Sequence, residues 1–235
     1  GHSGWAIRKN SPQLHTEVDE FFAKFLEKQH LLEAETIRFN RQIRQIANNT
    51  GNQEWQRFEL MQQLFEKYGQ HYAFDPLMLA AQGYQESQLK QEKRGPSGAI
   101  GVMQVLPSTA SALKVGDIKQ LEPNIHAGAK YLDALMSQYF ADADFQGDNR
   151  TLFSFASYNA GPGKIKRMRK IAEERGLDPN RWFNHVELVV AEKVGWETTT
   201  YVRNIYKYYA AYKLQLEVEE QQKQALARLA NTTAD

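Results

Sequence analysis

Hydrophobic residues recur at intervals of three and four along most of this chain, the spacing that places them on one face of an α-helix. Five helices are expected downstream of residue 52. The first ends at Gly69 and has its apolar face at Leu60, Leu64, Phe65 and Tyr68, and the second begins at Asp75-Pro76 and continues through Ala80, Ala81 and Tyr84. The third begins at about Pro123, with Ile125, Ala129, Leu132 and Met136 on one face; the fourth runs from about Arg150 to Gly161, with Phe153 and Ala156; and the fifth begins at about Thr198, with Tyr201, Ile205, Tyr208 and Tyr212. No alternating run is long enough for a major sheet, apart from short ribbons expected near residues 100–105. The pattern therefore predicts an all-α fold.

The two ends of the chain follow different patterns. Residues 5–8 are typical of a short strand, and a helix is expected from Ser11, a capping residue that is followed by proline. Residues 48–52, which cluster Asn and Gly, are the best linker candidate. The opening Gly1-His2-Ser3 is typical of a cloning scar, which implies that a natural signal peptide has been removed. The tail after Leu216 is rich in Glu and Gln and is expected to fray.

The composition excludes several classes of protein. With 42% hydrophobic and 24% charged residues among 235, the chain is neither disordered nor fibrous in character. Its 29 Lys and Arg against 28 Asp and Glu leave a net charge of +1, so it lacks the global basic field typical of a nucleic-acid-binding protein. The absence of cysteine excludes disulfides and thiolate metal sites. Since His71, His126 and His185 also lack metal-ligand spacing, we expect no metal and no cofactor.

Glu86 is the most informative acidic residue, because it falls near the end of the helix that opens at Asp75-Pro76. A carboxylate at a helix C-terminus is repelled by the helix dipole, and burial among Tyr and Met side chains would disfavour its charge further. Both effects raise the pKa of a carboxyl group and so suit a general acid. On its own, a helix-terminal Glu is more often a solvated surface group.

The segments around Glu86 in the expected fold suit a carbohydrate. Met103 and Gln104 offer an apolar platform with an amide beside it, in a loop whose glycines permit close approach of a flat ligand. Tyr158-Asn159 at a helix end, and Glu197 and Tyr201 at a helix start, add aromatic and polar groups. A sugar ring has apolar faces and a polar rim, so its binding cleft needs both kinds of side chain. Each of these motifs alone is more often a turn, a C-cap or a favourable N-terminal acid.

Taken together, the motifs carry a family resemblance. In order they are Glu86-Ser87, Gly101-Val102-Met103-Gln104, Asn124-Ile125 with Gly128 and Tyr131-Leu132, Tyr158-Asn159-Ala160-Gly161, and Glu197-Thr198 with Tyr201-Val202. This series resembles the signatures of the soluble lytic transglycosylase family, which is related in fold to goose-type lysozyme. The resemblance covers about residues 58–212 and implies an all-α, lysozyme-like domain.

The resemblance also implies an activity. Glu86 is expected to be the sole catalytic acid and base at the β-1,4 bond between N-acetylmuramic acid and N-acetylglucosamine in peptidoglycan. It would protonate the leaving oxygen and then accept the proton of the muramyl C6 hydroxyl, which attacks C1 and leaves a 1,6-anhydromuramyl end. The substrate-binding positions implied by the family are Ser87, Met103, Gln104, Tyr158, Asn159 and Tyr201, with Glu197 near the cleft in a supporting role.

Two other functions remain open: a muramidase in which water attacks, and a noncatalytic module that only binds peptidoglycan. The chain departs from the family pattern at three places. Gly95-Pro96 replaces the common Ser-Pro, which removes a hydroxyl from the site and is expected to loosen its loop. Val102 replaces Leu, and Ser157 replaces Ala and adds a polar group that needs a partner.

The expected organisation has three parts: residues 1–52, a tag scar with a partial solute-binding-like remnant and linker; residues 53–215, the catalytic domain; and residues 216–235, a tail. Residues 5–28 resemble the closing strand and last helix of a solute-binding domain, an arrangement similar to that of membrane-bound members of the family. This implies a location in the periplasm, peripheral to the outer membrane. The expected partners are peptidoglycan strands and muropeptides, and an amino-acid or peptide effector of the full-length protein. The basic cluster within residues 164–170 is interpreted as a solvated helix face that attracts anionic peptidoglycan or lipid rather than nucleic acid.

Overall fold

The computed structural model describes residues 16, 20 and 53–232. The chain divides into two compact units, Gly1–Gln45 and Ile46–Asp235, of which the second is described below. The strand, helix and solute-binding-like remnant expected in residues 5–28, and the linker expected at 48–52, lie outside the described residues.

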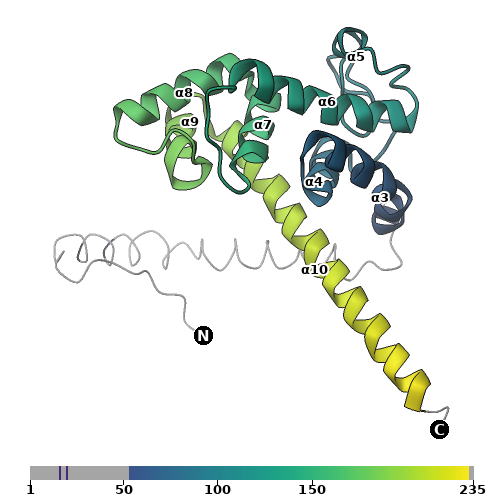
Figure 1. Cartoon of the computed structure of the whole chain (residues 1–235). Helices are drawn as coiled ribbons and strands as arrows, with labels where there is room; N and C mark the ends of the chain where they lie inside the picture. Colours follow the sequence, from purple (N-terminus) through teal and green to yellow (C-terminus); the bar gives the residue numbers. More distant parts are fainter. Residues whose placement is uncertain (1–15, 17–19, 21–52, 233–235) are drawn as a thin grey trace. The chain divides into compact units, whose positions relative to one another are not determined.

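Helices make up the regular structure of the second unit, so the predicted all-α fold is confirmed (Figure 1). They are α3 (Gln53–Tyr72), α4 (Pro76–Ser87), α5 (Pro107–Leu113), α6 (Leu121–Tyr139), α7 (Asn149–Ala160), α8 (Pro162–Glu174), a kinked helical turn (Trp182–Val186), α9 (Glu187–Lys193) and α10 (Trp196–Thr232). The ribbon expected near residues 100–105 consists of two isolated antiparallel bridges, Arg94 with Ile100 and Ile100 with Val105.

Helix α4 is the centre of the domain, and it packs against α3 and α10. Its sequence is apolar on nearly every side, which is typical of a helix buried all round rather than of an amphipathic surface helix. The predicted start at Asp75-Pro76 is confirmed, because the Asp75 carboxylate accepts a hydrogen bond of 2.8 Å from the amide of Leu77. This cap fixes where α4 begins and therefore where its last residues lie.

The apolar stripe predicted for the first helix is partly wrong. Leu60 is 78% exposed, whereas Trp55, Phe58 and Met61 join Phe65 and Tyr68 in the core. An apolar stripe that begins at Phe58 fits the three- and four-residue spacing as well as one that begins at Leu60. The stripe with Phe58 faces the core because Phe58 stacks on Tyr212 of α10, with ring centroids 4.6 Å apart. The helix also continues past Gly69 to Tyr72. The Gly69 backbone lies so close to the next turn that an added Cβ would be 2.8 Å from the carbonyl oxygen of Phe74.

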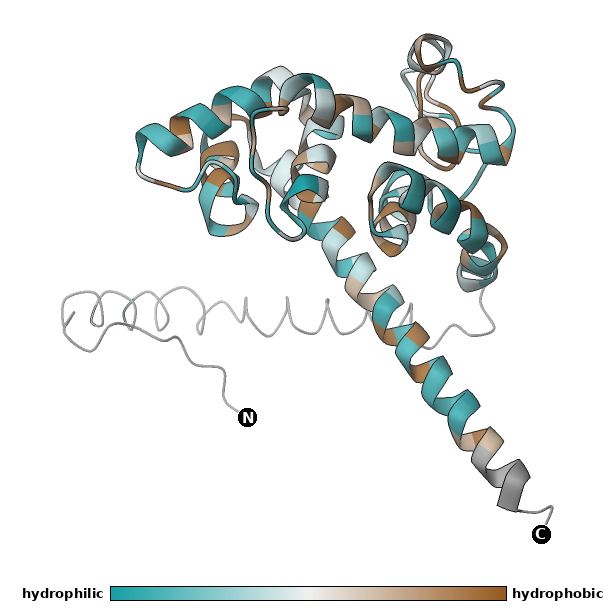
Figure 2. Ribbon diagram, viewed as in Figure 1, coloured by the Kyte–Doolittle hydropathy of each residue, from teal (hydrophilic) through white to brown (hydrophobic). Residues whose placement is uncertain are grey.

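Helix α10 differs from its prediction at both ends. It begins at Trp196, two residues before the expected start, and it continues through Thr232, although fraying was expected after Leu216. The Glu- and Gln-rich tail favours helix because these residues lose little freedom there and pair one turn apart, as Gln215 does with Glu219 at 3.1 Å. The first part of α10 contacts α4, α7 and α9, and the rest extends beyond them with mixed hydrophilic and hydrophobic positions (Figures 1 and 2). No helix within the described residues has the length and hydrophobicity required to cross a membrane.

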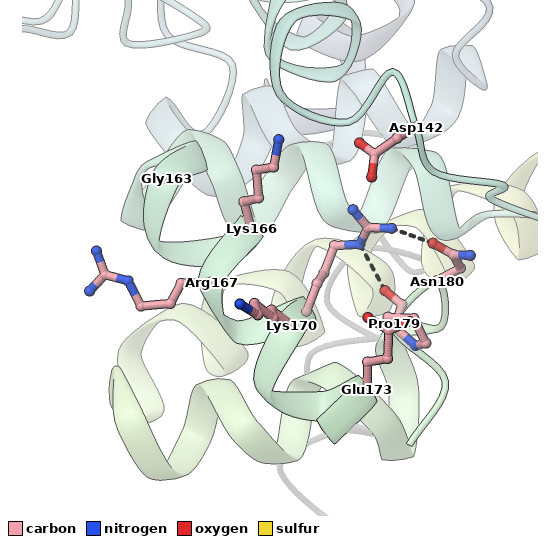
Figure 3. Close-up of a pocket in the computed structure, with 9 residues that line it drawn as sticks. Asp142, Gly163, Lys166, Arg167, Lys170, Glu173, Pro179 and Asn180 are labelled. Carbon is pink, nitrogen blue, oxygen red and sulfur yellow. Dashed lines mark hydrogen bonds between the residues drawn. The ribbon is translucent and has the colours of Figure 1, made fainter. Parts of the chain in front are cut away.

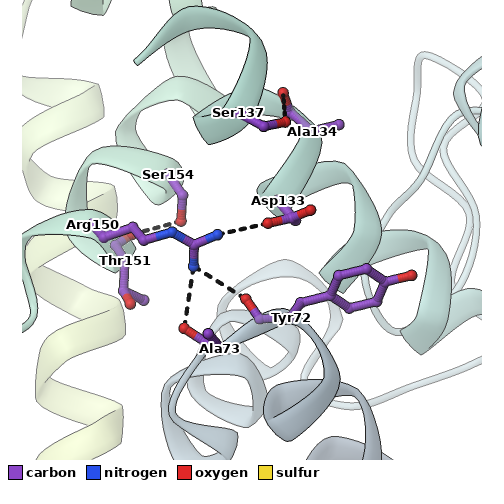
Figure 4. Close-up of polar contacts among 8 residues, drawn as sticks. All are labelled: Tyr72, Ala73, Asp133, Ala134, Ser137, Arg150, Thr151 and Ser154. Atoms are coloured by element: carbon purple, nitrogen blue, oxygen red, sulfur yellow. Dashed lines mark hydrogen bonds and ion pairs between the residues drawn. The ribbon is translucent and has the colours of Figure 1, made fainter. Parts of the chain in front are cut away.

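Arg150 ties three helices together through one guanidinium group (Figure 4). Its Nη2 donates to the Asp133 carboxylate of α6 at 2.6 Å, and its Nη1 donates to the carbonyl oxygens of Tyr72 and Ala73 at 3.2 and 3.1 Å. The guanidinium also lies 4.3 Å from the ring centroid of Phe74. Because α7 carries Arg150 and α3 ends at Tyr72, these contacts fix α7 relative to α3 and α6.

Gly128 allows α6 to approach the loop that follows α4. A Cβ added there would lie 2.6 Å from Cγ and 2.8 Å from Cβ of Met103, a residue that is itself buried. We expect Gly128→Ala to lower the free energy of unfolding by about 1–3 kcal/mol, because overpacking displaces Met103. Denaturant unfolding followed by circular dichroism measures this change.

Gly163→Ala is the matched control, because Gly163 is also helical and an added Cβ there would meet nothing within 4 Å. That variant should match or slightly exceed the wild-type stability, since alanine favours helix over glycine. Equal stability of the Gly128 and Gly163 variants would contradict the packing argument.

Candidate active site

Glu86 lies in the last turn of α4, where the helix ends abruptly. The next two residues outside the helix, Gln88 and Leu89, both have left-handed backbone conformations, with φ of 57° and 59°. A left-handed conformation costs a non-glycine residue about 1–2 kcal/mol. Leu89 is completely buried, so core packing offsets part of this cost. The double turn directs the chain away from α4 immediately after the carboxyl group.

The Glu86 side chain is partly buried and bonded to α10. The Tyr201 hydroxyl donates a hydrogen bond of 2.5 Å to Oε1 of Glu86. The same hydroxyl accepts a hydrogen bond of 3.3 Å from Nε2 of Gln82, which is fully buried on α4. Gln82 thereby orients the Tyr201 proton toward Glu86.

Burial raises the pKa of the Glu86 carboxyl above its ordinary value, as the sequence predicted. The hydrogen bond from Tyr201 and the charge of Lys93 act in the opposite direction, because both stabilise the carboxylate. Burial also raises the pKa of Tyr158 and of Tyr201 well above the ordinary tyrosine value, with the charge of Glu86 adding to the effect. Both phenols therefore remain protonated hydrogen-bond donors at neutral pH.

The site loop, residues 88–106, is fixed by the fully buried Asn124 of α6. Its side-chain oxygen accepts from the amide of Met103 at 2.8 Å, and its side-chain nitrogen donates to the carbonyl oxygens of Ile100 and Ile118 at 2.8 and 3.0 Å. Gly101, with φ of 79°, passes so close to this amide that a side chain there would clash with it. Asn124 was part of the family motif, and the structure shows that it orders the loop.

Two of the predicted substrate-binding residues lie beneath the surface of the site. Ser87 is 1% exposed, and its hydroxyl contacts the carbonyl oxygens of Val102 and Gly83 at 2.8 and 3.0 Å. Met103 is also 1% exposed and packs against Gly128. In this structure both residues hold the site loop against the core rather than presenting their side chains to solvent.

Gln104 and Tyr158 meet at the same loop. Gln104 has a left-handed φ of 48°, and its side-chain nitrogen donates to the Gly101 carbonyl at 2.8 Å. The Tyr158 hydroxyl of α7 donates to the carbonyl oxygen of Met103 at 2.6 Å. Tyr158 therefore connects α7 to the loop, with its phenol close enough to Glu86 for the carboxylate charge to raise its pKa.

Asn159 and Glu197 lie with Tyr201 on the site groove, a surface hollow of about 330 Å³. Its lining residues are Gln85, Asn159, Trp196, Glu197, Thr200, Tyr201 and Asn204. Asn159 accepts a hydrogen bond of 2.8 Å from the Thr198 hydroxyl, which orients its amide. The groove thus joins the end of α7 and the start of α10 beside the residue that precedes Glu86.

The departures from the family pattern have distinct structural outcomes. The loosening expected at Gly95 stays a prediction. The Gly95 amide donates to the Ala99 carbonyl at 2.9 Å, and a Cβ there would lie 2.8 Å from Oε1 at the end of the Gln104 side chain. The Ser157 hydroxyl is buried and has no hydrogen-bond partner among the residues that the structure describes.

The sequence analysis missed Gln82 and Trp196. Gln82 lies one helical turn before Glu86, so the i, i+4 spacing was the available signal. Trp196 is 69% exposed at the groove, and exposure of so large an aromatic side chain is visible only in the structure. In the part of the chain that the structure describes, no group of three or more His, Asp or Glu side chains is arranged to hold a metal ion.

Comparison with known proteins places this chain in a family. Residues 63–180 match the model of the transglycosylase SLT domain. The chain is 32% identical over 185 residues to membrane-bound lytic murein transglycosylase F of Desulfosudis oleivorans, covering 76% of this chain and 39% of that protein. It is 34% identical to membrane-bound lytic murein transglycosylase F 1 of Alkalilimnicola ehrlichii, covering 62% of this chain and 32% of that protein. The chain thus spans only a third or so of the length of these curated relatives.

Solved structures support the predicted lysozyme-like fold. The 70 kDa soluble lytic transglycosylase of Escherichia coli superposes with a TM-score of 0.52 at 26% identity, over 66% of this chain and 24% of that chain. An inactive mutant of the lytic transglycosylase Slt of Pseudomonas aeruginosa gives a TM-score of 0.50 at 24% identity, over 65% of this chain and 24% of that chain.

Replacing Tyr201 by Phe should raise the pKa of Glu86 further, because the desolvation remains while a hydrogen bond that stabilises the carboxylate is lost. The pKa is measured from the ¹³C shift of the Glu86 carboxyl carbon against pH in glutamate-labelled protein. Tyr139→Phe, at a tyrosine that is 39% exposed, serves as the control and should leave this titration unchanged. An unchanged or lowered pKa in Tyr201→Phe would show that the bond does not stabilise the charged form.

Proposed function

Since this chain belongs to the transglycosylase SLT domain family, we propose that it cleaves peptidoglycan as a lytic transglycosylase, with Glu86 as the only catalytic acid and base. The bond cleaved is the β-1,4 link between N-acetylmuramic acid and N-acetylglucosamine, and the product is a 1,6-anhydromuramyl end. The observation that carries this proposal is the Glu86 carboxyl itself: partly buried, raised in pKa, and bonded to Tyr201 beside the site groove.

The hydrogen bonds of Tyr201 support placing the acidic proton of Glu86 on its second oxygen, Oε2. Because the Tyr201 hydroxyl accepts from Gln82, its own proton points to Oε1 of Glu86. Oε1 is therefore an acceptor, and the acidic proton of neutral Glu86 resides on Oε2. From there it passes to the glycosidic oxygen as the bond to C1 breaks, and the N-acetylglucosamine side leaves as an alcohol.

The resulting carboxylate then serves as the base. It removes the proton from the C6 hydroxyl of the same muramyl residue, and the C6 oxygen forms a bond to C1. The proton returns to Glu86, so the enzyme ends in the state in which it began and no water is consumed. The bond from Tyr201 and the charge of Lys93 both stabilise the carboxylate at this stage.

An attacking group within the substrate removes the need for a second carboxylate. Two-carboxylate glycosidases use their second group either to activate water or as the nucleophile. Here the polar groups that shift the pKa of Glu86 are Tyr201 and Lys93, neither of which is a carboxylate. An intramolecular attack in the right ring conformation contributes about 7–11 kcal/mol through proximity, and general acid–base catalysis contributes about 10²–10⁴-fold.

The substrate-binding roles follow from position. Trp196 presents an exposed indole on which a sugar face can stack, and Asn159 and Glu197 offer polar groups for the hydroxyl and acetamide rim. Gln104 and Tyr158 act through the site loop, which both of them contact. Ser87 and Met103 act indirectly, by holding that loop in place.

The full-length protein is proposed to act in the periplasm, peripheral to the outer membrane, on peptidoglycan strands and muropeptides. The relatives in Desulfosudis oleivorans and Alkalilimnicola ehrlichii are named membrane-bound, which supports an association with a membrane. An amino-acid or peptide effector of an upstream domain belongs to the same proposal. We also propose that the chain divides into three parts, residues 1–52, 53–215 and 216–235.

Replacing Glu86 by Gln should reduce turnover of peptidoglycan by at least about a hundredfold, because the amide cannot donate an acidic proton or accept one back. Muropeptide binding should persist, since the amide keeps the size of the side chain. Release of soluble muropeptides measures turnover, and calorimetric titration measures binding. Glu59→Gln, at an exposed position of α3, is the matched control and should retain full activity. Retained turnover in Glu86→Gln would reject the assignment.

The product identifies the attacking group. Mass spectrometry of digested sacculi should show fragments lighter by one water than the corresponding hydrolytic products. Fragments with the mass of hydrolytic products would identify a muramidase instead. Binding without any released fragment would identify a noncatalytic peptidoglycan-binding module.

A further inference from the structure

Helix α8 borders a large pocket that takes no part in the mechanism above. The pocket has a volume of about 570 Å³ and lies between α8, the segment after α6 and the segment that follows α8 (Figure 3). Four cations line it, Lys166, Arg167, Arg169 and Lys170, against the two acids Asp142 and Glu173. The lining therefore carries an excess of two positive charges in a chain whose net charge is only +1.

Three of the four cations, Lys166, Arg167 and Lys170, lie on one face of α8. Positions 163, 166, 167 and 170 follow the i, i+3, i+4, i+7 spacing of a single helix face, with glycine opening one end. Lys166, Arg167 and Lys170 are exposed and form no ion pair with any carboxylate in the described part of the chain. Arg175, just after α8, does form an ion pair, with Glu192 at 2.6 Å.

Arg169 is buried, unlike these three exposed cations. It is 8% exposed, and it donates to the Pro179 carbonyl at 2.9 Å and to Oδ1 of Asn180 at 2.5 Å, the two bonds drawn in Figure 3. Its guanidinium also lies over the rings of Phe140 and Phe145, at 5.5 and 5.3 Å from their centroids. These contacts occupy two of its five N–H donors and hold its charge in place.

The order of charges along α8 does not serve helix stability. The basic residues occupy positions 164–170, and the acidic residues Glu173 and Glu174 occupy the last turn. The helix dipole favours the opposite arrangement, with acids first and bases last. A layout that disfavours the isolated helix, and leaves three cations unpaired beside a pocket, is typical of a surface for an anionic ligand.

We propose that this pocket, the α8 basic pocket, binds carboxylate groups of the peptide attached to the glycan substrate. The inference rests on the proposed function, because the peptide reaches the protein only with its glycan. A peptide fits the lining because it bears amide and amino groups as well as carboxylates, and the pocket offers Asp142 and Glu173 beside its four cations. A membrane surface fits less well, because the pocket is concave and α8 has no large exposed apolar side chain.

The α8 basic pocket begins close to the site groove along the chain. Helix α7 carries Tyr158 and Asn159 in its last turn, and α8 begins at Pro162 directly after it. At about 1.5 Å per residue, Lys166 and Lys170 lie about 6 and 12 Å along α8 from that start. A peptide of four or five extended residues spans up to about 13–18 Å.

The test compares one substrate with and without its peptides. The probes are peptidoglycan glycan strands that carry their peptides and the same strands after an amidase has removed them. The double variant Lys166→Gln with Lys170→Gln should raise KM for the peptide-bearing strands about 3- to 10-fold, while kcat stays unchanged. KM for the peptide-free strands should equal that of the wild type. The difference should shrink as ionic strength rises, because these contacts are exposed.

The matched control is Lys213→Gln with Lys223→Gln, two exposed lysines of α10, and it should behave as wild type on both substrates. Thermal unfolding of both double variants should equal that of the wild type, since all four side chains are at the surface.

Three outcomes would overturn the inference while leaving the proposed function intact. An unchanged KM on both substrates would show that the pocket binds nothing in the strand. An equal rise on both would assign the cations to the glycan instead of the peptide. Loss of sedimentation with phosphatidylglycerol vesicles, without any peptide-dependent change in KM, would assign them to a membrane. Failure of the wild-type protein to cleave the peptide-bearing strands would instead reject the proposed function.

Discussion

The hydrogen bond from Tyr201 to Glu86 joins two residues that are 115 positions apart in the chain, and the site depends on it. A carboxyl group that loses much of its hydration is costly to ionise, and one unsupported by donors would be a poor base after it has given up its proton. Here burial favours the protonated acid, while Tyr201 and Lys93 limit the penalty on the carboxylate. The α4–α10 contact sets this balance, so the packing of these two helices and the acidity of Glu86 cannot be separated.

The site loop shows how a segment with little regular structure is made rigid. Its order comes from side chains of the neighbouring helices, which satisfy its backbone groups: Asn124 of α6, Ser87 of α4 and Tyr158 of α7. Glycine at positions 101 and 128 permits the close approach that these bonds require. A buried amide that is fully bonded specifies one conformation, whereas apolar contacts alone would tolerate several.

Local sequence signals predicted what depends on neighbours in the chain. Asp75-Pro76 identified the start of α4, and the position of Glu86 near its end followed. Features that depend on tertiary packing could not be predicted from the sequence. Leu60 fits the helical spacing as well as Phe58 does, and only the stacking on Tyr212 decides between them.

The same limit applies at the site. Ser87 and Met103 belong to two motifs that were predicted to form the site. Whether such a residue faces the ligand or supports the loop is decided by burial, which spacing does not encode. Trp196 was missed for the converse reason, since an aromatic residue in a helical pattern is usually core and this one is exposed.

The consecutive left-handed residues Gln88 and Leu89 have a consequence for cooperativity. Neither is glycine, so the reversal of the chain after Glu86 persists only while the Leu89 side chain remains in the core. Opening this reversal extracts a leucine from the interior, which means that the segment cannot unfold locally at low cost. Its amide hydrogens should therefore exchange with solvent together with those of α4, so that the turn after Glu86 belongs to the same folding unit as the centre of the domain.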